Sequence, residues 1–441
     1  MIQPSERTSL FIGVDIPSDD VITNCMHCGL CLPTCPTYAL TGLERSSPRG
    51  RIQLIKAVAD GELAMSEGFV DEMNFCLDCQ ACETACPAGV RYGSLVEAAR
   101  AQIFQQGAEP RTTRWLKRFL LGWVFSRQQR LHALAVVLRW YQRSGLAWFL
   151  ERSGMLQLVS SRLAKLQPLA PTISTTFSSD VLAEYLPAYG SRRFRVGMLT
   201  GCIMDVAYGD VNAATVELLR KHGCDVITPR GQACCGSLTA HNGDMESARL
   251  MATRLLDLFS TANVDHVVLN SAGCGAFLKE YGHLFAGDPE RTEQALWLSA
   301  RTLDITEFLS RHGFQPTSTP RGGREGGRLR VAYHDACHLA HSQKVTLEPR
   351  ELLARIPGIE LVELPEASWC CGSAGIYNIV RHEDAMQMLD RKIQNIVSIS
   401  PDVLVTGNPG CMLQIHYGLT QRGLNVRIVH TASFLNEACV S

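Results

Sequence analysis

The sequence lacks several features that mark large classes of proteins. Its 441 residues carry a formal net charge of −1, so bulk electrostatics predict no particular partner and no nucleic acid. No run of about 18 apolar residues occurs, so no helix is expected to span a membrane. The polar N-terminus is not followed by the apolar stretch of a signal peptide, and we therefore expect none.

Nucleotide-binding loops are also missing. Neither G-x-G-x-x-G after a strand nor G-x-x-x-x-G-K-[ST] occurs, so no flavin or nicotinamide site is evident. Apolar residues make up 46% and charged residues 19%, which is ordinary for a globular protein. The length suffices for two or three domains with sizeable cores.

Cysteine, in contrast, is abundant, with 18 residues. In a small secreted protein this number would favour disulfides. In a long chain without an export signal, clustered cysteines favour metal binding in a reducing compartment. We therefore expect most of them to be metal or cluster ligands.

The spacing C-x2-C-x2-C-x3-C-P occurs twice, at residues 25–36 and 76–87. It is the ligand spacing of proteins with two 4Fe–4S clusters, in which the fourth cysteine of each motif ligates the other cluster. Zinc is the alternative, but it needs only four cysteines per site and no Cys-Pro end. The expected ligands are Cys25, Cys28, Cys31 and Cys86 for the first cluster, and Cys76, Cys79, Cys82 and Cys35 for the second.

Residues 1–110 should form a helical ferredoxin-like domain around these motifs. Apolar residues recur at near-helical spacing in 49–63, and 94–106 also reads as a helix. Arg45, Arg49 and Arg51 either offset the negative charge of the clusters or belong to a solvated basic loop.

Residues 111–192 differ in composition. The stretch 111–153 has nine Arg or Lys, one acid, and four of the six tryptophans, and we expect a basic, aromatic, amphipathic helical pair. Such a pair either lies on an anionic membrane surface or packs against protein. Residues 165–192 contain several prolines and a Ser/Thr-rich tract, and they read as a linker.

The remainder of the chain is a duplication. Two arrays share the pattern Cys…Cys-Cys-Gly…Cys, and matched cysteines are offset by 135, 136 and 137 residues. The arrays are Cys202, Cys234, Cys235 and Cys274, then Cys337, Cys370, Cys371 and Cys411. They predict two domains with a shared plan, 193–311 and 329–441, separated by an exposed linker at 312–328.

Each repeat alternates short apolar strands with helical patterns, which argues for parallel strands. The strands are expected at 196–199, 225–228 and 266–269, and at 331–333, 360–364 and 403–406. The cysteines follow the strands, and sites in such sheets gather at the carboxyl ends of strands. The fold class is therefore α+β multidomain: a helical two-cluster ferredoxin domain followed by a duplicated α/β cysteine-rich domain.

The chemistry of the two arrays stays open at this stage. Each holds a further cluster, another metal such as zinc, or a structural or redox-active group of thiols. His334, His338 and His341 beside the second array are metal ligands, proton relays or structural histidines. Cys224 and Cys439 lie outside every motif and should be free buried thiols.

The whole chain resembles the iron–sulfur subunits of bacterial glycolate oxidase and, more distantly, heterodisulfide-reductase-like and anaerobic glycerol-3-phosphate dehydrogenase subunits. The family-like stretches are Cys-Met-His-Cys-Gly-Leu-Cys (25–31), Pro-Arg-Gly-Arg-Ile (48–52), 271–282 and Cys-Cys-Gly-Ser-Ala-Gly-Ile-Tyr (370–377). The resemblance implies two flavoprotein-type partners that oxidise glycolate, with D-lactate as a further substrate. This subunit would pass electrons toward quinone from the cytoplasmic face of the inner membrane and carry no catalytic residues itself.

The two cysteine arrays differ at one position from those of related proteins, and this difference bears on the alternative functions. Heterodisulfide-reductase-like arrays end in C-x-x-C and hold a noncubane cluster, whereas Ser271 and Asn408 stand where the first cysteine of that pair would be. The alternatives are the electron-transfer subunit of a glycerol-3-phosphate or lactate dehydrogenase, a thiol–disulfide reductase, or an adaptor that anchors flavoproteins to the membrane.

Overall fold

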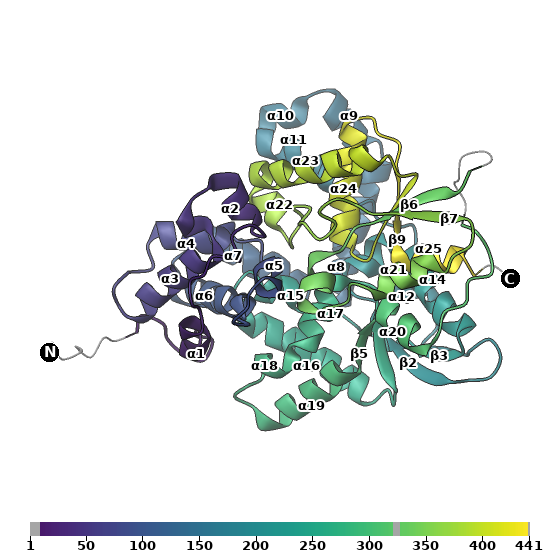
Figure 1. The fold of residues 1–441 in the computed structure, drawn as a ribbon, viewed down its shortest axis with the longest axis horizontal. Coiled ribbons are helices and arrows are strands. Elements are labelled where there is room, and N and C mark those ends of the chain that lie inside the picture. Colours follow the sequence, from purple (N-terminus) through teal and green to yellow (C-terminus); the bar gives the residue numbers. More distant parts are fainter. Residues whose placement is uncertain (1–8, 321–326, 440–441) are drawn as a thin grey trace.

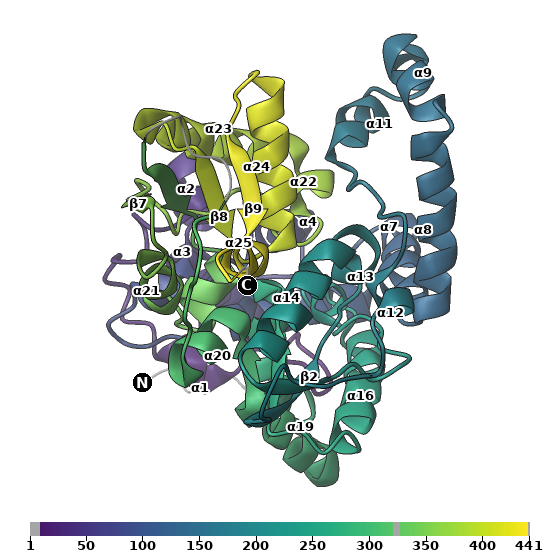
Figure 2. The ribbon, with the colours of Figure 1, turned by 90° about the vertical axis from the view of Figure 1, so that its right-hand side faces the viewer.

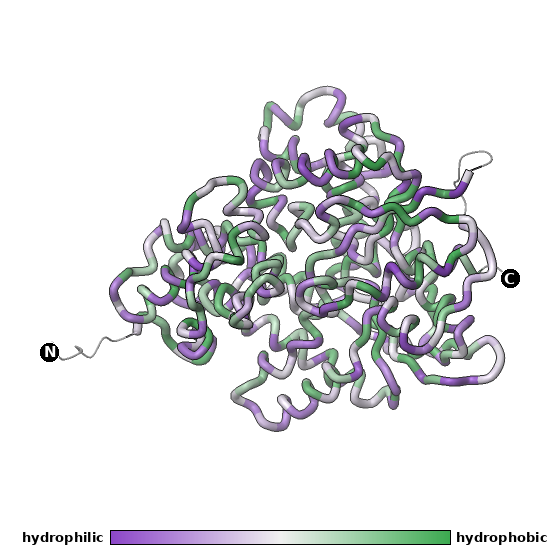
Figure 3. Tube along the Cα trace, viewed as in Figure 1, coloured by the Kyte–Doolittle hydropathy of each residue, from purple (hydrophilic) through white to green (hydrophobic). Residues whose placement is uncertain are grey.

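The computed structural model describes residues 9–320 and 327–439. A helical N-terminal domain packs against two sheet-containing domains, and a helical segment connects them (Figure 1). Hydrophilic and hydrophobic residues are interspersed along the chain (Figure 3), as expected for elements that bury one face. Within the described ranges, no helix has the length and apolar character needed to cross a bilayer.

Short helices surround the cysteine motifs of the N-terminal domain. The Ser47 hydroxyl caps α3 by accepting a hydrogen bond from the Gly50 amide, and Pro48 occupies its first turn. Ile55, Met73 and Leu95 pack in the core between the helices. The helices expected near 49–63 and 94–106 are confirmed as α3 and α6. The elements are α1 (Asp19–Thr23), α2 (Pro36–Thr41), η1 (Glu44–Ser46), α3 (Pro48–Ala59), α4 (Glu67–Phe75), α5 (Ala81–Thr84) and α6 (Tyr92–Gln106).

The connecting segment is helical along most of its length, and α8, α9 and α11 extend away from the body in Figure 2. Its elements are α7 (Arg111–Lys117), the π-helix η2 (Arg118–Val124), α8 (Gln128–Arg143), α9 (Leu146–Arg152), α10 (Met155–Val159), α11 (Ser161–Leu166), η3 (Gln167–Leu169) and α12 (Ser178–Val181). The stretch 165–192 is therefore more than a linker, because it contains α12 and also β1 (Tyr185–Leu186), which pairs antiparallel with β3.

The first sheet has the order β1-β3-β2-β4-β5, and all pairs other than β1 with β3 are parallel. The expected strands are present, and β5 is a further strand that the sequence pattern did not reveal. The elements are β2 (Phe194–Met198), α13 (Ile203–Ala207), α14 (Gly209–Lys221), β3 (Cys224–Ile227), α15 (Ser237–Ala240), α16 (Met245–Ser260), β4 (His266–Leu269), α17 (Ala272–Lys279), α18 (Tyr281–Leu284), α19 (Pro289–Arg301), β5 (Thr302–Asp304) and α20 (Ile305–His312).

The second sheet has the order β7-β6-β8-β9 and is parallel throughout. This order repeats that of β3-β2-β4-β5, so the duplication seen in the cysteines extends to the topology. The elements are β6 (Leu329–Tyr333), the π-helix η4 (His338–Ser342), α21 (Glu348–Ala354), β7 (Ile359–Val362), α22 (Tyr377–Val380), α23 (His382–Ile399), β8 (Val403–Thr406), α24 (Pro409–Gln421), β9 (Arg427–His430) and α25 (Thr431–Glu437).

The two repeats share one hydrophobic core. Val196 and Met198 of β2 belong to the same buried cluster as Val331 of β6 and Phe434 of α25. The sequence predicted an exposed linker at 312–328. This prediction was wrong for the first part of the segment, because Phe314 is buried in this cluster. The amides of Thr317 and Ser318 donate to the Ala438 carbonyl, and residues 321–326 lie outside the described residues.

A buried histidine joins the ends of two strands across the repeats. The Nδ1 atom of His430 accepts a hydrogen bond from the Ala432 amide, so Nε2 carries the proton and donates to the Asn270 carbonyl at 2.8 Å. Burial lowers the pKa of His430 to about 4, since a charged ring would lose the Ala432 bond and its hydration.

We expect this histidine to make the protein sensitive to mild acid. Because the unfolded histidine titrates near 6.5 and the folded one near 4, stability is full above the unfolded value and falls as pH decreases toward the folded one. Between about pH 7.5 and 5.5 this costs roughly 1 kcal/mol. Urea unfolding of wild type and His430→Gln at both pH values tests this, and an equal pH loss in both proteins would contradict it.

Candidate functional site

The two N-terminal cysteine loops have the same backbone course. His27 and Asp78, the third residues of the two motifs, both adopt φ 55°, and Gly29 and Gln80 also have positive φ. Alternation of right- and left-handed residues curls a loop tightly and turns its amides inward. In the second loop the Asp78 amide already donates to the Cys76 thiol at 3.3 Å.

The eight thiols of the N-terminal motifs form two sets that differ in burial. Each set contains the first three cysteines of one motif and the fourth cysteine of the other. One set is buried and the other is half-buried or exposed. The buried set lines a single small cavity, beside Tyr92 and Arg51, and consists of Cys35, Cys76, Cys79 and Cys82. Cys35 therefore lies with the second motif although it ends the first.

The other set lies near the surface. Cys28 is exposed, whereas Cys25, Cys31 and Cys86 are half-buried. The side-chain amide of Asn24 donates to the Ala88 carbonyl at 2.8 Å, which ties the start of the first motif to the end of the second. This contact joins the residue before Cys25 to a residue two positions after Cys86, and the assignment of Cys86 to the first cluster stays a prediction.

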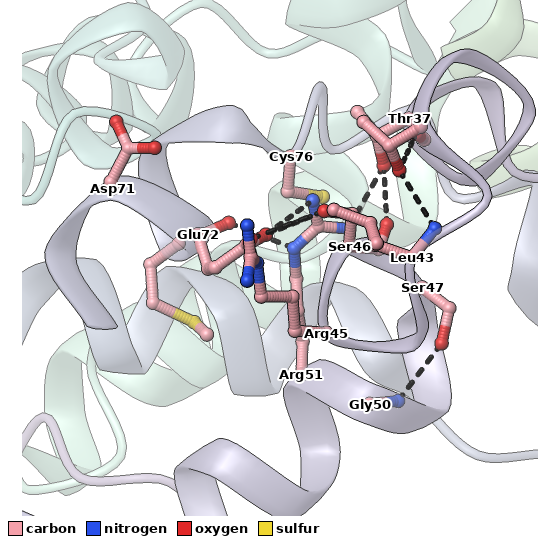
Figure 4. Close-up of polar contacts among 12 residues, drawn as sticks. Thr37, Leu43, Arg45, Ser46, Ser47, Gly50, Arg51, Asp71, Glu72 and Cys76 are labelled. Atoms are coloured by element: carbon pink, nitrogen blue, oxygen red, sulfur yellow. Dashed lines mark hydrogen bonds and ion pairs between the residues drawn. The ribbon is translucent and has the colours of Figure 1, made fainter. Parts of the chain in front are cut away.

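A buried arginine lies beside Cys76 of the inner set (Figure 4) and lines the same cavity as the four thiols. The Arg51 side chain is fully buried and donates to the Glu72 carbonyl and the Thr37 hydroxyl, at 2.8 and 3.1 Å. Burial opposes its charge, but Tyr92, Cys76, Cys35 and Glu72 together raise the pKa of Arg51. It is therefore a permanent cation at this cavity, whereas Arg45 is exposed and binds Glu72.

Hydrogen bonds to the thiols come from groups that the sequence did not single out. The Cys35 thiol lies 3.2 Å from the Thr37 hydroxyl. Burial raises the pKa of the Cys79 and Cys82 thiols, and neighbouring thiols add to the effect. The thiols therefore keep their protons until a bound metal ion displaces the protons.

The cysteines of each duplicated array also converge. In the first array the thiols contact one another in the order Cys202, Cys234, Cys235 and Cys274. In the second the order is Cys337, Cys370, Cys371 and Cys411. The carboxyl ends of β2, β3 and β4, and of β6, β7 and β8, bring them together as expected.

The glycine after each cysteine pair has a specific conformational task. Gly236 and Gly372 have φ 94° and 89°, a region that other residues rarely adopt. A Cβ at Gly372 would lie 2.5 Å from the Ala385 carbonyl oxygen, so a side chain does not fit. Their amides point to the cysteine two positions earlier, with N–Sγ distances of 3.4 and 3.5 Å.

Ser271 and Asn408 assist the last cysteine of each array. The Asn408 side-chain amide donates to the Cys411 thiol at 3.5 Å. A hydrogen bond from Ser271 lowers the pKa of Cys274, although the contact with Cys235 is the larger cause. Each array thus has four thiols and one hydrogen-bonding residue in place of a fifth cysteine.

The buried N-terminal thiols lie at the junction of the three domains. Cys79 belongs to the same hydrophobic cluster as Cys370, and Cys337 packs against this cluster. The hydroxyl of Ser342 in η4 donates to the Gln80 side chain at 2.5 Å, and His341 contacts Thr84 at 3.0 Å. The second repeat is therefore docked directly on the second cysteine loop.

The first repeat reaches the same loop through ionic contacts. Nδ1 of His241 lies 3.2 Å from Asp78 and 2.6 Å from Glu97. Burial opposes the charge on His241, but the two carboxylates raise its pKa to about 10. The charged imidazole thus compensates acids buried at the junction, and sequence inspection gave no sign of this cluster.

The two cysteines outside the arrays behave as expected. Cys224 and Cys439 are buried and free, and burial raises the pKa of Cys224 to about 12. They pack in the core that the two repeats share.

Comparison with known families agrees with this division of the chain. A model of the 4Fe-4S dicluster domain matches residues 21–90, and one of a cysteine-rich domain matches 196–279 and 331–416. A model described as "Glycolate oxidase iron-sulfur subunit, linker region" matches 112–170. The chain thus carries a domain for two 4Fe–4S clusters, and the four thiols that line the small cavity are the donor set that one cluster needs.

Similar whole proteins are also known. The "Probable glycolate oxidase iron-sulfur subunit" of Bacillus subtilis (strain 168) is 39% identical over 95% of this chain and 94% of its own length. The "Glycolate oxidase iron-sulfur subunit" of Escherichia coli (strain K12) is 30% identical over 91% of each chain. "Lactate utilization protein A" of Geobacillus thermodenitrificans is 35% identical over 55% of this chain and 99% of its own. The chain belongs to the family of glycolate oxidase iron–sulfur subunits.

Proposed function

We propose that this chain is the electron-transfer subunit of a glycolate-oxidising complex, in which flavin-containing partners oxidise the substrate and quinone takes the electrons. The observation that supports this most is the division of the eight N-terminal thiols into an outer and a buried set. When 4Fe–4S clusters are bound, each takes one electron, so a two-electron oxidation is divided into single steps.

The residues around the thiols perform distinct tasks in this proposal. The outer set, Cys25, Cys28, Cys31 and Cys86, holds one cluster close to solvent, and the inner set, Cys35, Cys76, Cys79 and Cys82, holds the other. Exposed Met26 and Leu30 flank Cys28, and they provide an apolar contact for a partner subunit. Helices and the second repeat cover the inner set and exclude water.

Lactate is a second candidate substrate for the complex. The similarity to several proteins named "Lactate utilization protein A" favours it. Glycolate and lactate are both 2-hydroxy acids, and the choice between them belongs to the substrate pocket of a partner.

We expect glycolate to reduce the clusters of the assembled complex. The chain is co-purified anaerobically with its flavoprotein partners, and EPR spectra are recorded after addition of glycolate, D-lactate or glycerol 3-phosphate. Glycolate should elicit the signals that dithionite produces, whereas Cys76→Ser should lose the inner-cluster signal while the flavin is still reduced. Cys224→Ser is the matched control. Flavin reduction without any cluster signal in wild type would contradict the proposal.

Arg51 should raise the reduction potential of the inner cluster, because a cation favours the added electron. One charge at a few ångströms under an effective dielectric constant near 20 is equivalent to a potential on the order of 100 mV. We therefore expect Arg51→Leu to lower the midpoint potential by about that amount in an EPR-monitored titration. Arg51→Lys should retain most of the effect, and exposed Arg45→Leu should change little. Equal potentials in Arg51→Leu and wild type would show that the guanidinium does not act on the cluster.

We further propose that the connecting segment contacts an anionic membrane surface. Trp115, Phe119 and Trp123 form an exposed stack with ring centroids 5.4 and 5.3 Å apart. Trp140 of α8 and Trp148 of α9 are 65% and 63% exposed, and these two helices extend from the body (Figure 2). Tryptophan beside arginine is typical of interfacial helices.

Vesicle flotation tests this contact. The wild-type complex should float with vesicles that contain phosphatidylglycerol and should remain at the bottom with neutral vesicles or high salt. The pair of substitutions Trp140→Ser and Trp148→Ser should weaken flotation several-fold without changing iron content. Leu250→Ser, which removes an equally exposed apolar side chain elsewhere, is the control. Unchanged flotation of the tryptophan variant would assign this surface to a protein partner.

A further inference from the structure

The second array differs from the first by a histidine among its thiols. A ring nitrogen of His334 and the Sγ atoms of Cys371 and Cys411 all lie within 4.8 Å of one another. In residues 9–320 and 327–439, the other close group of potential metal ligands is Asp78, Glu97 and His241, which has no thiol. A thiol–imidazole group of this compactness is therefore specific to the second repeat.

His334 is placed as a ligand and has no evident structural task. It follows β6 directly, is 1% exposed, and neither ring nitrogen has a hydrogen-bond partner of normal geometry. A buried polar group without a partner is costly, so such a ring calls for an occupant.

The first array offers the matched comparison. Cys202 and Cys337 are 135 residues apart, and the same offset places Leu199 opposite His334. Leu199 is buried in the hydrophobic cluster that also contains Cys202, Cys234 and Cys235. Both positions are thus interior, but only the second repeat has a side chain there that can bind a metal.

The spacing of the donors suits one ion better than a cubane. Donors of a tetrahedral Zn²⁺ at 2.0–2.3 Å from the metal are roughly 3.5–3.8 Å apart. Among the described residues, no three thiols of the ferredoxin-type motifs are within 4.8 Å of one another. Among the described residues, the group of His334, Cys371 and Cys411 is therefore more compact than any three thiols of the ferredoxin-type motifs.

A buried lysine balances the charge. The Lys392 side chain is fully buried, and its ammonium donates to the carbonyls of Glu366 and Ala367. It also interacts electrostatically with the thiols of Cys370, Cys371 and Cys411. Three thiolates, one neutral imidazole and Zn²⁺ carry a net charge of −1, and one ammonium neutralises it.

We propose that the second array is a zinc site, with the close group of His334, Cys371 and Cys411 as three ligands and Cys370, which contacts Cys371, as the fourth. The three thiols release their protons to solvent as the ion binds, and no electron is exchanged. Zn²⁺ has no redox chemistry at such a site. The site therefore fixes the second repeat against the buried cysteine loop, and electrons do not pass through it. The inference is independent of the substrate of the complex.

Metal analysis of the full-length chain, purified anaerobically, tests the site. Wild type should contain about eight irons and one zinc. His334→Leu, which installs the residue of the first repeat, should lose the zinc and keep the iron, whereas His334→Cys should keep both. Zinc X-ray absorption should show one nitrogen and three sulfurs in wild type and four sulfurs in His334→Cys. Exposed His283→Ala and buried Cys224→Ser are the controls.

Several results would overturn the proposal. They are the absence of zinc in wild type, iron above eight that falls in His334→Leu, or zinc that is lost in Cys235→Ser of the first array. If His334→Leu does not fold, the His334→Cys spectrum decides, since an unchanged nitrogen contribution would exclude His334 as a ligand.

Discussion

The structure depends on the gathering of thiols into small groups and on the compensation of their charge. Thiolates repel one another and resist burial, so each group needs cations, amides or protons around it. Arg51 serves the buried N-terminal set, and Lys392 serves the second array. The amides of Gly236 and Gly372 serve the paired cysteines of the repeats.

The junction of the three domains follows from this constraint. The second cysteine loop is buried because both repeats cover it, the first through His241 and the second through η4. The loop in turn carries Asp78 into the interior, where the imidazolium of His241 offsets its charge. An electron carrier gains from such burial, since a dry site fixes the potential and excludes side reactions.

Duplication supplied two copies of one sheet topology, and the copies have diverged at their sites. The order of the four parallel strands and the contacts among thiols are the same in both. Position 199 is an apolar core residue, whereas position 334 is a buried imidazole close to two thiols. The absence of the fifth cysteine, with Ser271 and Asn408 bonded to thiols instead, also separates both arrays from thiol–disulfide reductases that use five.

The sequence by itself determined the cysteine groups, the helical N-terminal domain, the repeat and its parallel strands. These depend on local spacing and periodicity, which are readable along the chain. Contacts between residues far apart in sequence have no such local sign, and only the tertiary structure decided them. They include the burial of Arg51 among thiols, the cluster of Asp78, Glu97 and His241, the strand β1 within an expected linker, and the position of His334 beside Cys371 and Cys411. Each arises where separate domains pack together or strand ends converge, and packing of that kind is set by the whole fold.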